Sequence, residues 1–256
     1  MAAISMQTEA ELLPLLETLY DSRNPTRRWL HRTRRDWIIG KLRQYAHGDR
    51  ALEIGFGAGV YLPALAELFS EVIGTDLEQA HLSHARKITA KYPNVSLRRD
   101  DICNSKLAEG SFSLVLCSEV IEHLSDSPAA LAAIHRLLEP GGTLILSTPQ
   151  KWSLLEMSCK VAFLPGVINL VRKIYGEAIF ETEHINLMTA DTVARQLENA
   201  GFRIHERFKS GMYVPAIAEF LGESGLKLER WLERKLQRRR MDWILWTQYY
   251  VASAVA

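Results

Sequence analysis

Three glycines lie at alternate positions in the segment ALEIGFGAGVYL, residues 51–62. Gly55, Gly57 and Gly59 follow an apolar run that holds one acidic residue, Glu53. Glycine has no Cβ atom and adopts positive φ readily, so this loop can press its backbone amides against a ligand. A dinucleotide-binding loop would carry its last glycine or alanine where this chain has valine. Because the upstream carboxylate repels phosphate and attracts an ammonium group, the sequence predicts a ligand that is cationic near the loop.

Acidic residues also end the next two apolar segments. Asp76 ends EVIGTD, where a carboxylate can accept hydrogen bonds from both hydroxyl groups of a ribose. Asp101 follows the next segment, and its carboxylate or the amide of Ile102 could meet an adenine edge. Three successive strand ends therefore each offer a suitable group for a nucleoside.

The segment SEVIEHL, residues 118–124, holds a second set of reactive side chains. A helix over 119–123 would place Glu119, Glu122 and His123 on one face, at the mouth of the pocket. Two carboxylates and an imidazole suit a divalent cation, and His184 in TEHINLM could supply a fourth ligand. These four residues are the candidate metal ligands. The alternatives are that His123 or His184 acts as a plain base or positioning group, and that the carboxylate only caps the helix or orients the imidazole.

The elements that would position these residues follow an alternating pattern. Apolar, β-rich segments alternate with helical patterns, which is typical of a parallel sheet covered on both faces. The pattern predicts strands at 51–55, 72–76, 95–99, 113–117 and 143–148 and helices at 60–69, 78–91, 119–123 and 128–138. Two further strands, 202–208 and 243–251, would close the sheet.

From about residue 50 to 150 the chain resembles the class I S-adenosylmethionine-dependent methyltransferases. LEPGG at 138–142 matches a motif of that family, whereas Ser113 replaces its usual aspartate. The resemblance implies an α/β fold with a doubly wound, seven-stranded, mostly parallel sheet whose sixth and seventh strands are antiparallel. It also implies that S-adenosyl-L-methionine is bound by Glu53, Gly55, Gly57, Gly59, Asp76, Leu77, Asp101, Ile102 and Ser118.

We expect one domain with a helical extension and a helical insertion. Its parts are an N-terminal extension (1–48), a core that binds the methyl donor (49–149), a lid insertion (150–183) and a C-terminal part with the last two strands (184–256). The lid is largely apolar and long for a loop, which indicates a functional role. It offers an acceptor Trp152, Leu154, Met157, Phe163 and Ile168 but few polar groups.

The segment after the fourth strand bears on the methyl acceptor. Enzymes that methylate exocyclic amines of bases have an Asp/Asn-Pro-Pro-Tyr motif there, which this chain lacks. Glu-x-x-Glu-His segments occur in small-RNA 2′-O-methyltransferases and in ubiquinone-pathway O-methyltransferases, and the overall layout resembles the latter more. We therefore expect O-methylation of a small apolar, aromatic or lipid-like acceptor. The alternatives are a metal-dependent RNA 2′-O-methyltransferase and a non-catalytic cofactor-binding subunit.

Composition narrows the partners and the compartment. The 31 Lys and Arg residues against 30 Asp and Glu give a formal charge of +1, so no overall field favours nucleic acid or anionic lipid. Three separated cysteines without a CxxC pair fit a reducing compartment. Neither a secretion signal nor an uncharged run of the roughly 20 residues that span a bilayer is evident, so we expect a cytoplasmic protein. The oligomeric state stays open.

Two local stretches are strongly basic. Residues 23–50 and 226–240 each combine Lys and Arg with an apolar stripe, which in the second stretch comprises Leu228, Trp231, Leu232 and Leu236. We expect surface helices whose stripes pack on the domain. Contact with an anionic membrane surface, which would make the protein peripheral to the membrane, and contact with RNA phosphates are the alternatives.

Overall fold

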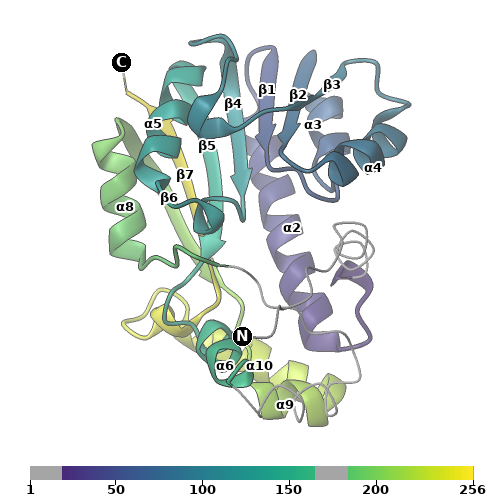
Figure 1. The fold of residues 1–256 in the computed structure, drawn as a ribbon. Coiled ribbons are helices and arrows are strands. Elements are labelled where there is room, and N and C mark those ends of the chain that lie inside the picture. The colour runs from purple at the N-terminus through teal and green to yellow at the C-terminus, as the bar shows by residue number, and fades with distance from the viewer. Residues whose placement is uncertain (1–18, 165–183, 256) are drawn as a thin grey trace, which may run out of the picture.

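A seven-stranded sheet forms the centre of the computed structural model, which describes residues 19–164 and 184–255 (Figure 1). The strand order is β3-β2-β1-β4-β5-β7-β6. The strands are β1 (Arg50–Ile54), β2 (Glu71–Asp76), β3 (Val95–Arg99), β4 (Phe112–Ser118), β5 (Leu138–Pro149), β6 (Phe202–Ser210) and β7 (Thr247–Ala254). All seven predicted strands are confirmed, with shifted ends. Only β7 runs opposite to the others, since it pairs antiparallel with both β5 and β6.

Helices cover both faces of the sheet (Figure 1). They are α2 (Pro25–Tyr45), α3 (Leu62–Leu68), α4 (Gln79–Thr89), α5 (Ser127–Leu137), α6 (Leu154–Ala162), α8 (Ala190–Asn199), α9 (Pro215–Phe220) and α10 (Gly222–Leu236), with short 3-10 turns η1 (Leu19–Asp21), η2 (Ile102–Asn104), η3 (Ile121–His123) and η4 (Asp242–Ile244). One apolar core joins α5 and α8 to the sheet, and a second joins α2, α3 and α4 to its other face. The doubly wound arrangement is therefore confirmed.

The helix predicted over 119–123 does not form. The Glu119 N–H donates to the Ser147 carbonyl oxygen at 2.9 Å, so the pairing of β4 with β5 continues one residue beyond Ser118. Glu119 then turns the chain with a φ of 57°, which a residue with a side chain rarely adopts. Only η3 is helical, and Glu119 therefore does not share a helix face with Glu122 and His123.

Three helices cluster at one end of the molecule, beyond the carboxyl ends of the strands (Figure 1). Leu154 of α6 and Leu232 and Leu236 of α10 pack against one buried cluster, which comprises Met212, Ile244 and Leu245. Helix α2 reaches from the sheet to this end, where its capping residue Asn24 donates to the Ala218 carbonyl oxygen of α9 at 3.2 Å. Helix α6 lies within the predicted lid, whose residues 165–183, with Ile168, lie outside the described residues. Among the helices described here, none has the length and apolar character needed to span a bilayer.

The predicted packing of the second basic stretch is wrong in part. Leu232 and Leu236 pack inward, but Leu228 and Trp231 are 40% and 49% exposed. The inward positions between them are occupied by Glu229 and Glu233, which are buried.

These two glutamates hold the loop that joins β6 to α9. Glu229 accepts hydrogen bonds from the Val214 N–H and the Thr26 hydroxyl, and Glu233 accepts from the N–H groups of Gly211 and Met212. Buried backbone donors need such acceptors, because an unpaired N–H away from water is costly. Burial raises the pKa of both carboxyl groups. The helix therefore turns its carboxylates inward and two of its large apolar side chains outward.

We expect Glu229→Ala to lower the free energy of unfolding by about 1–3 kcal/mol, because Thr26 and Val214 would lose their acceptor inside the protein. Glu223→Ala on the same helix is the matched control, since Glu223 is 70% exposed and its ion pair with Arg28 is partly solvated. The control should change stability by less than about 0.5 kcal/mol. Urea denaturation measures both variants, and equal destabilisation would contradict the inward role of Glu229.

Candidate functional site

The glycine loop between β1 and α3 adopts a conformation that other residues avoid. Gly55, Gly57 and Gly59 have φ values of 65°, 50° and 71°. A Cβ atom on Gly55 would lie 2.6 Å from Cγ2 of Val120, in the loop that follows β4. Glycine is therefore required at this position both by the backbone and by the close approach of the two loops.

Asp76 joins the glycine loop to the end of β2. Its carboxylate accepts from the Gly57 N–H at 2.9 Å, from the Glu78 N–H at 2.9 Å and from Nδ1 of His81 at 3.1 Å. Burial alone would raise the pKa of Asp76, but the hydrogen bonds from His81, Glu78 and Gly57 hold it below its usual value. A carboxylate kept ionised beside the loop can accept further hydrogen bonds from ribose hydroxyl groups.

Glu53 is the second carboxylate beside this loop and has different surroundings. It is 2% exposed, and its Oε2 atom has no hydrogen-bond partner among the described residues. Burial, and then the charge of Asp76, raise the pKa of Glu53 well above its usual value. An unsatisfied buried carboxylate costs free energy, and a cationic ligand would remove that cost.

Three more residues predicted to contact the nucleoside lie in the loops that follow β2 and β3. Leu77 is 47% exposed. Asp101 caps η2, accepting from the Cys103 N–H at 3.0 Å and from the Asn104 side chain at 2.8 Å. Ile102 is buried at 6% exposure. The carboxylate of Asp101 is thus already used within its own turn.

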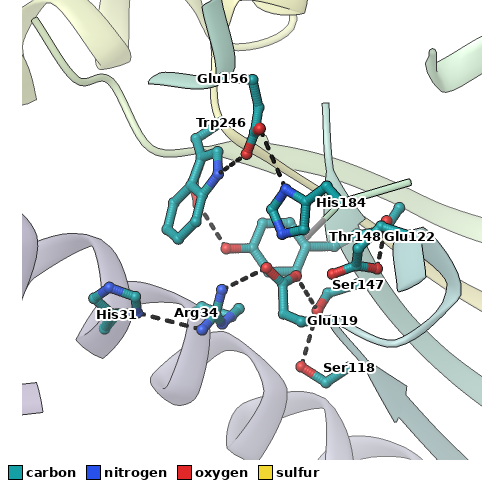
Figure 2. Close-up of polar contacts among 12 residues, drawn as sticks. His31, Arg34, Ser118, Glu119, Glu122, Ser147, Thr148, Glu156, His184 and Trp246 are labelled. Carbon is teal, nitrogen blue, oxygen red and sulfur yellow. Dashed lines mark hydrogen bonds and ion pairs between the residues drawn. The ribbon is translucent and has the colours of Figure 1, made fainter. Parts of the chain in front are cut away.

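An ion pair fixes the chain just after β4 (Figure 2). Arg34 of α2 donates to Oε2 of Glu119 at 2.6 Å, and the Ser147 hydroxyl donates to Oε1 at 2.9 Å. Ser118 lies in the same network, with its Oγ 2.9 Å from that of Ser147. Since both carboxylate oxygens of Glu119 are engaged by the protein, Glu119 is held apart from the residues that follow it.

Glu122, His123 and His184 come together as the sequence predicts. One ligand atom from each lies within 4.8 Å of the others. Glu122 is fully buried, accepts from the Thr148 hydroxyl through Oε2 at 2.9 Å, and has no hydrogen-bond partner for Oε1 among the described residues. Burial, and then the charge of Glu119, raise the pKa of Glu122. Glu119, which the sequence analysis also placed among the metal ligands, lies outside this group and is bound to Arg34.

Backbone pairing brings His184 to this group from a distant part of the chain. The N–H groups of Ile185 and Asn186 both donate to the Glu122 carbonyl oxygen, at 3.1 and 2.9 Å. The ring centroids of His123 and His184 are 5.1 Å apart, and the two ring planes are inclined by 63°.

Glu156 of α6 orients His184 (Figure 2). It is 4% exposed, its Oε2 lies 3.2 Å from Nδ1 of His184, and its Oε1 accepts from the Trp246 indole N–H at 3.1 Å. Because an ionised carboxylate only accepts hydrogen bonds, this contact assigns a proton to Nδ1 and leaves Nε2 of the neutral ring with a lone pair. That nitrogen is therefore able to accept a proton or bind a metal.

Several of these residues were missed by the sequence analysis. Arg34 is one of several arginines on α2, and nothing in their spacing distinguishes it. Glu156 is the acidic residue of an apolar segment, and only its contacts give it a role. The STP segment that ends β5 was the one sequence feature that could have indicated this network. Its residues Ser147 and Thr148 place their hydroxyl groups beside Glu119 and Glu122.

Comparison with known proteins agrees with this geometry. A family profile for the methyltransferase domain matches residues 20–207. A "probable S-adenosylmethionine-dependent methyltransferase" of Mycolicibacterium smegmatis is 28% identical over 87% of this chain and 77% of that protein. The ubiquinone biosynthesis O-methyltransferase of Pseudomonas aeruginosa is 36% identical over 40% of this chain, and that match spans only 44% of the enzyme. A crystal structure of an Aquifex aeolicus SAM-dependent methyltransferase covers 97% of this chain and all of its own, with 15% identity and a TM-score of 0.61.

The chain therefore belongs to the class I S-adenosylmethionine-dependent methyltransferases. It is an enzyme that uses S-adenosyl-L-methionine as its methyl donor. The match to the ubiquinone-pathway enzymes is a local one, and the Aquifex structure supports the fold alone.

We expect Asp76→Ala to weaken binding of the methyl donor by about 1–3 kcal/mol, roughly 5- to 150-fold in Kd, because it removes the anchor of the Gly57 N–H and a carboxylate that can accept from ribose hydroxyl groups. Glu109→Ala is the control, since Glu109 precedes β4 at the opposite end of the sheet and is 73% exposed. Calorimetry with S-adenosylhomocysteine measures both, and normal affinity in the Asp76 variant would contradict this assignment.

Proposed function

We propose that this methyltransferase acts on an oxygen atom of a small apolar or aromatic acceptor, with Glu122, His123 and His184 around the acceptor hydroxyl group. The observation that carries the proposal is the fully buried Oε1 atom of Glu122, which lies beside two imidazoles, 4.0 Å from Nε2 of His123, and accepts no hydrogen bond from the described residues. The donor supplies a methyl group activated by the adjacent sulfonium. The protein must align an acceptor with it and remove the acceptor's proton.

The donor side of the site fits a cation. Glu53 presents a carboxylate oxygen that accepts no hydrogen bond within the part of the chain that the structure describes, and the glycine loop offers backbone where side chains are excluded. We propose that Glu53 binds the α-ammonium group of the donor and that Asp76 binds its ribose. Leu77 and Ile102 would flank the adenine, whereas Asp101 would contribute mainly by fixing the turn that holds Ile102.

The acceptor side of the site lies next along the chain. Val120 touches the glycine loop, and η3 begins one residue later, so the two sides share a wall. Nε2 of His184 is available to take the proton from a hydroxyl group, because Glu156 holds the opposite ring nitrogen. A carboxylate on Nδ1 also stabilises the imidazolium that forms when Nε2 accepts this proton.

The same three residues would suit a divalent metal. Two imidazoles and a carboxylate form a three-ligand set that leaves coordination positions for acceptor oxygens. A metal there would lower the pKa of a bound hydroxyl group. Glu119 is not part of that set, because its oxygens are held by Arg34 and Ser147.

Two further observations support an oxygen atom as the methylated atom and an apolar molecule as the acceptor. The Pseudomonas relative is named as an O-methyltransferase of ubiquinone biosynthesis, and its match covers 40% of this chain. Helix α6, which supplies Glu156, is otherwise largely apolar, with Leu154 and Leu155 packed in the clusters at this end of the molecule.

We expect His184→Ala to lower turnover by about 10²- to 10⁴-fold while donor affinity stays within about twofold, because His184 acts on the acceptor and not on the donor. Turnover is measured with a methyl-labelled donor and a cell extract, with mass spectrometry to identify the labelled product as a methyl ether. His47→Ala, on an exposed histidine far from the site, is the control and should be unchanged. A labelled amine or carbon product would refute the oxygen assignment.

Chelation separates the two roles of this histidine. Loss of turnover in EDTA, restored by one added divalent metal, is the result for a metal site. Turnover that persists after thorough chelation is the result for a plain base.

Donor affinity should depend on pH through Glu53. Its raised pKa means that it is protonated, and unable to pair with an ammonium group, at the acid end of the range. Affinity for S-adenosylhomocysteine should therefore rise as the pH increases above the ordinary titration range of a glutamate, for as long as the α-amino group of the ligand stays charged. Glu53→Gln should bind more weakly and show a flat profile. A wild-type affinity that is flat or falls with pH would be inconsistent with this pairing.

A further inference from the structure

We propose that the outer face of α10, with the residues that immediately flank it, docks this enzyme onto an anionic lipid bilayer. The inference goes beyond the methyl transfer proposed above and does not depend on it. It rests on how the helix sorts its charges, on which apolar side chains it exposes, and on where it lies.

Helix α10 separates its acidic residues from its basic ones. Seven Lys and Arg residues lie between 227 and 240, and all of them are exposed. The acidic residues in the same interval, Glu229 and Glu233, are buried and accept hydrogen bonds from the loop over 211–214. Acidic residues at the two ends are already bound, Glu223 to Arg28 and Asp242 to Lys209. A stretch of mixed charge in the sequence thus becomes an almost purely cationic outer face.

Large apolar side chains are exposed in the same segment. They are Phe220, Leu221, Leu228, Trp231, Met241 and Trp243, each at least 40% exposed. Lys235 places its ammonium 6.0 Å from the centre of the Trp231 ring. Tryptophan beside lysine is typical of the boundary between lipid headgroups and acyl chains, where the ring lies among the headgroups and the lysine stem extends to phosphate.

This combination favours a lipid surface over nucleic acid. The phosphates of RNA would attract the basic residues and its bases could stack on Phe220, but RNA offers no apolar partner to Leu221 and Leu228. A bilayer with anionic headgroups accommodates both kinds of side chain at once. Because the whole chain has a formal charge of only +1, the attraction comes from this face and not from the protein as a whole.

The position of α10 relates the proposed membrane contact to the acceptor side of the enzyme. Helices α6, α9 and α10 lie at the end of the molecule towards which the strands point (Figure 1). Leu232 and Leu236 pack against the same buried cluster as Leu154 of α6, which lies two residues before the Glu156 that contacts His184. Docking through α10 would therefore place the acceptor side of the enzyme close to the membrane.

Vesicle co-sedimentation of the full chain tests the proposal. The vesicles contain two parts phosphatidylcholine to one part phosphatidylglycerol, and vesicles of phosphatidylcholine alone serve as the comparison. We expect binding to the anionic vesicles that weakens with added salt. The double variant Arg230→Glu with Arg234→Glu should bind at least about tenfold more weakly. Arg86→Glu with Lys87→Glu on α4 makes the same change of charge on exposed residues elsewhere and should stay within about twofold of wild type.

A second variant separates insertion from simple charge attraction. Trp231→Ser keeps every charge, and we expect it to lose several-fold in binding, with a steeper salt dependence in what remains. Calorimetry with S-adenosylhomocysteine should give the same donor affinity for all variants, which shows that they are folded and keeps this result independent of the catalytic proposal.

Three outcomes would overturn the inference. One is a wild-type protein that does not bind the anionic vesicles. Another is equal loss in the α10 and α4 charge variants, which would indicate non-specific attraction. The third is normal vesicle binding by Trp231→Ser together with competition by a single-stranded RNA, which would assign the face to nucleic acid.

Discussion

The close approach of Gly55 to Val120 is the contact on which the rest of the site depends. It brings the loop after β1 against the loop after β4, and no side chain fits between them. The donor loop lies on one side of this contact, and η3 with its buried glutamate lies on the other. Glu119, one residue before Val120, fixes the position by its left-handed backbone and its ion pair with Arg34. The glycine loop and the group of Glu122, His123 and His184 are therefore held in one fixed relation.

Buried carboxylates organise the other connections at this end of the molecule. Glu156 joins α6 to Trp246 and His184, and Glu229 and Glu233 join α10 to the loop before α9. A carboxylate has two oxygens and accepts several hydrogen bonds, so one side chain can satisfy donors from two elements. Glu122 differs from these three, because one of its oxygens is left without a hydrogen bond by the residues described. That difference leaves Glu122 able to bind a ligand directly, whereas Glu229 and Glu233 support the fold and Glu156 acts through His184.

The sequence was sufficient where the signal is local. Glycines at positive φ, acidic residues at strand ends and apolar strand segments are each visible in a few consecutive residues, and their positions were predicted closely. Apart from the approach of His184 to Glu122 and His123, contacts between distant segments were not predicted. Arg34 could not be chosen from its neighbours, and the backbone turn at Glu119 depends on pairing with Ser147. The packing of α10 was predicted from an apolar stripe, but the unsatisfied N–H groups of the loop over 211–214 turned its glutamates inward instead. Hydrogen-bond demand from a separate element overrode hydrophobic periodicity.

The order of the strands has a consequence for how the chain reaches this state. Strand β7 lies between β5 and β6, so β6 is joined to the sheet only through the strand made last. Leu144 of β5 pairs with Ala252 of β7, so this edge of β5 stays unpaired until β7 has been synthesised. During synthesis on the ribosome, the apolar edge of β5 would thus remain unpaired while the whole segment between β5 and β7 is made. We expect this interval to be the period in which the nascent polypeptide most needs a chaperone.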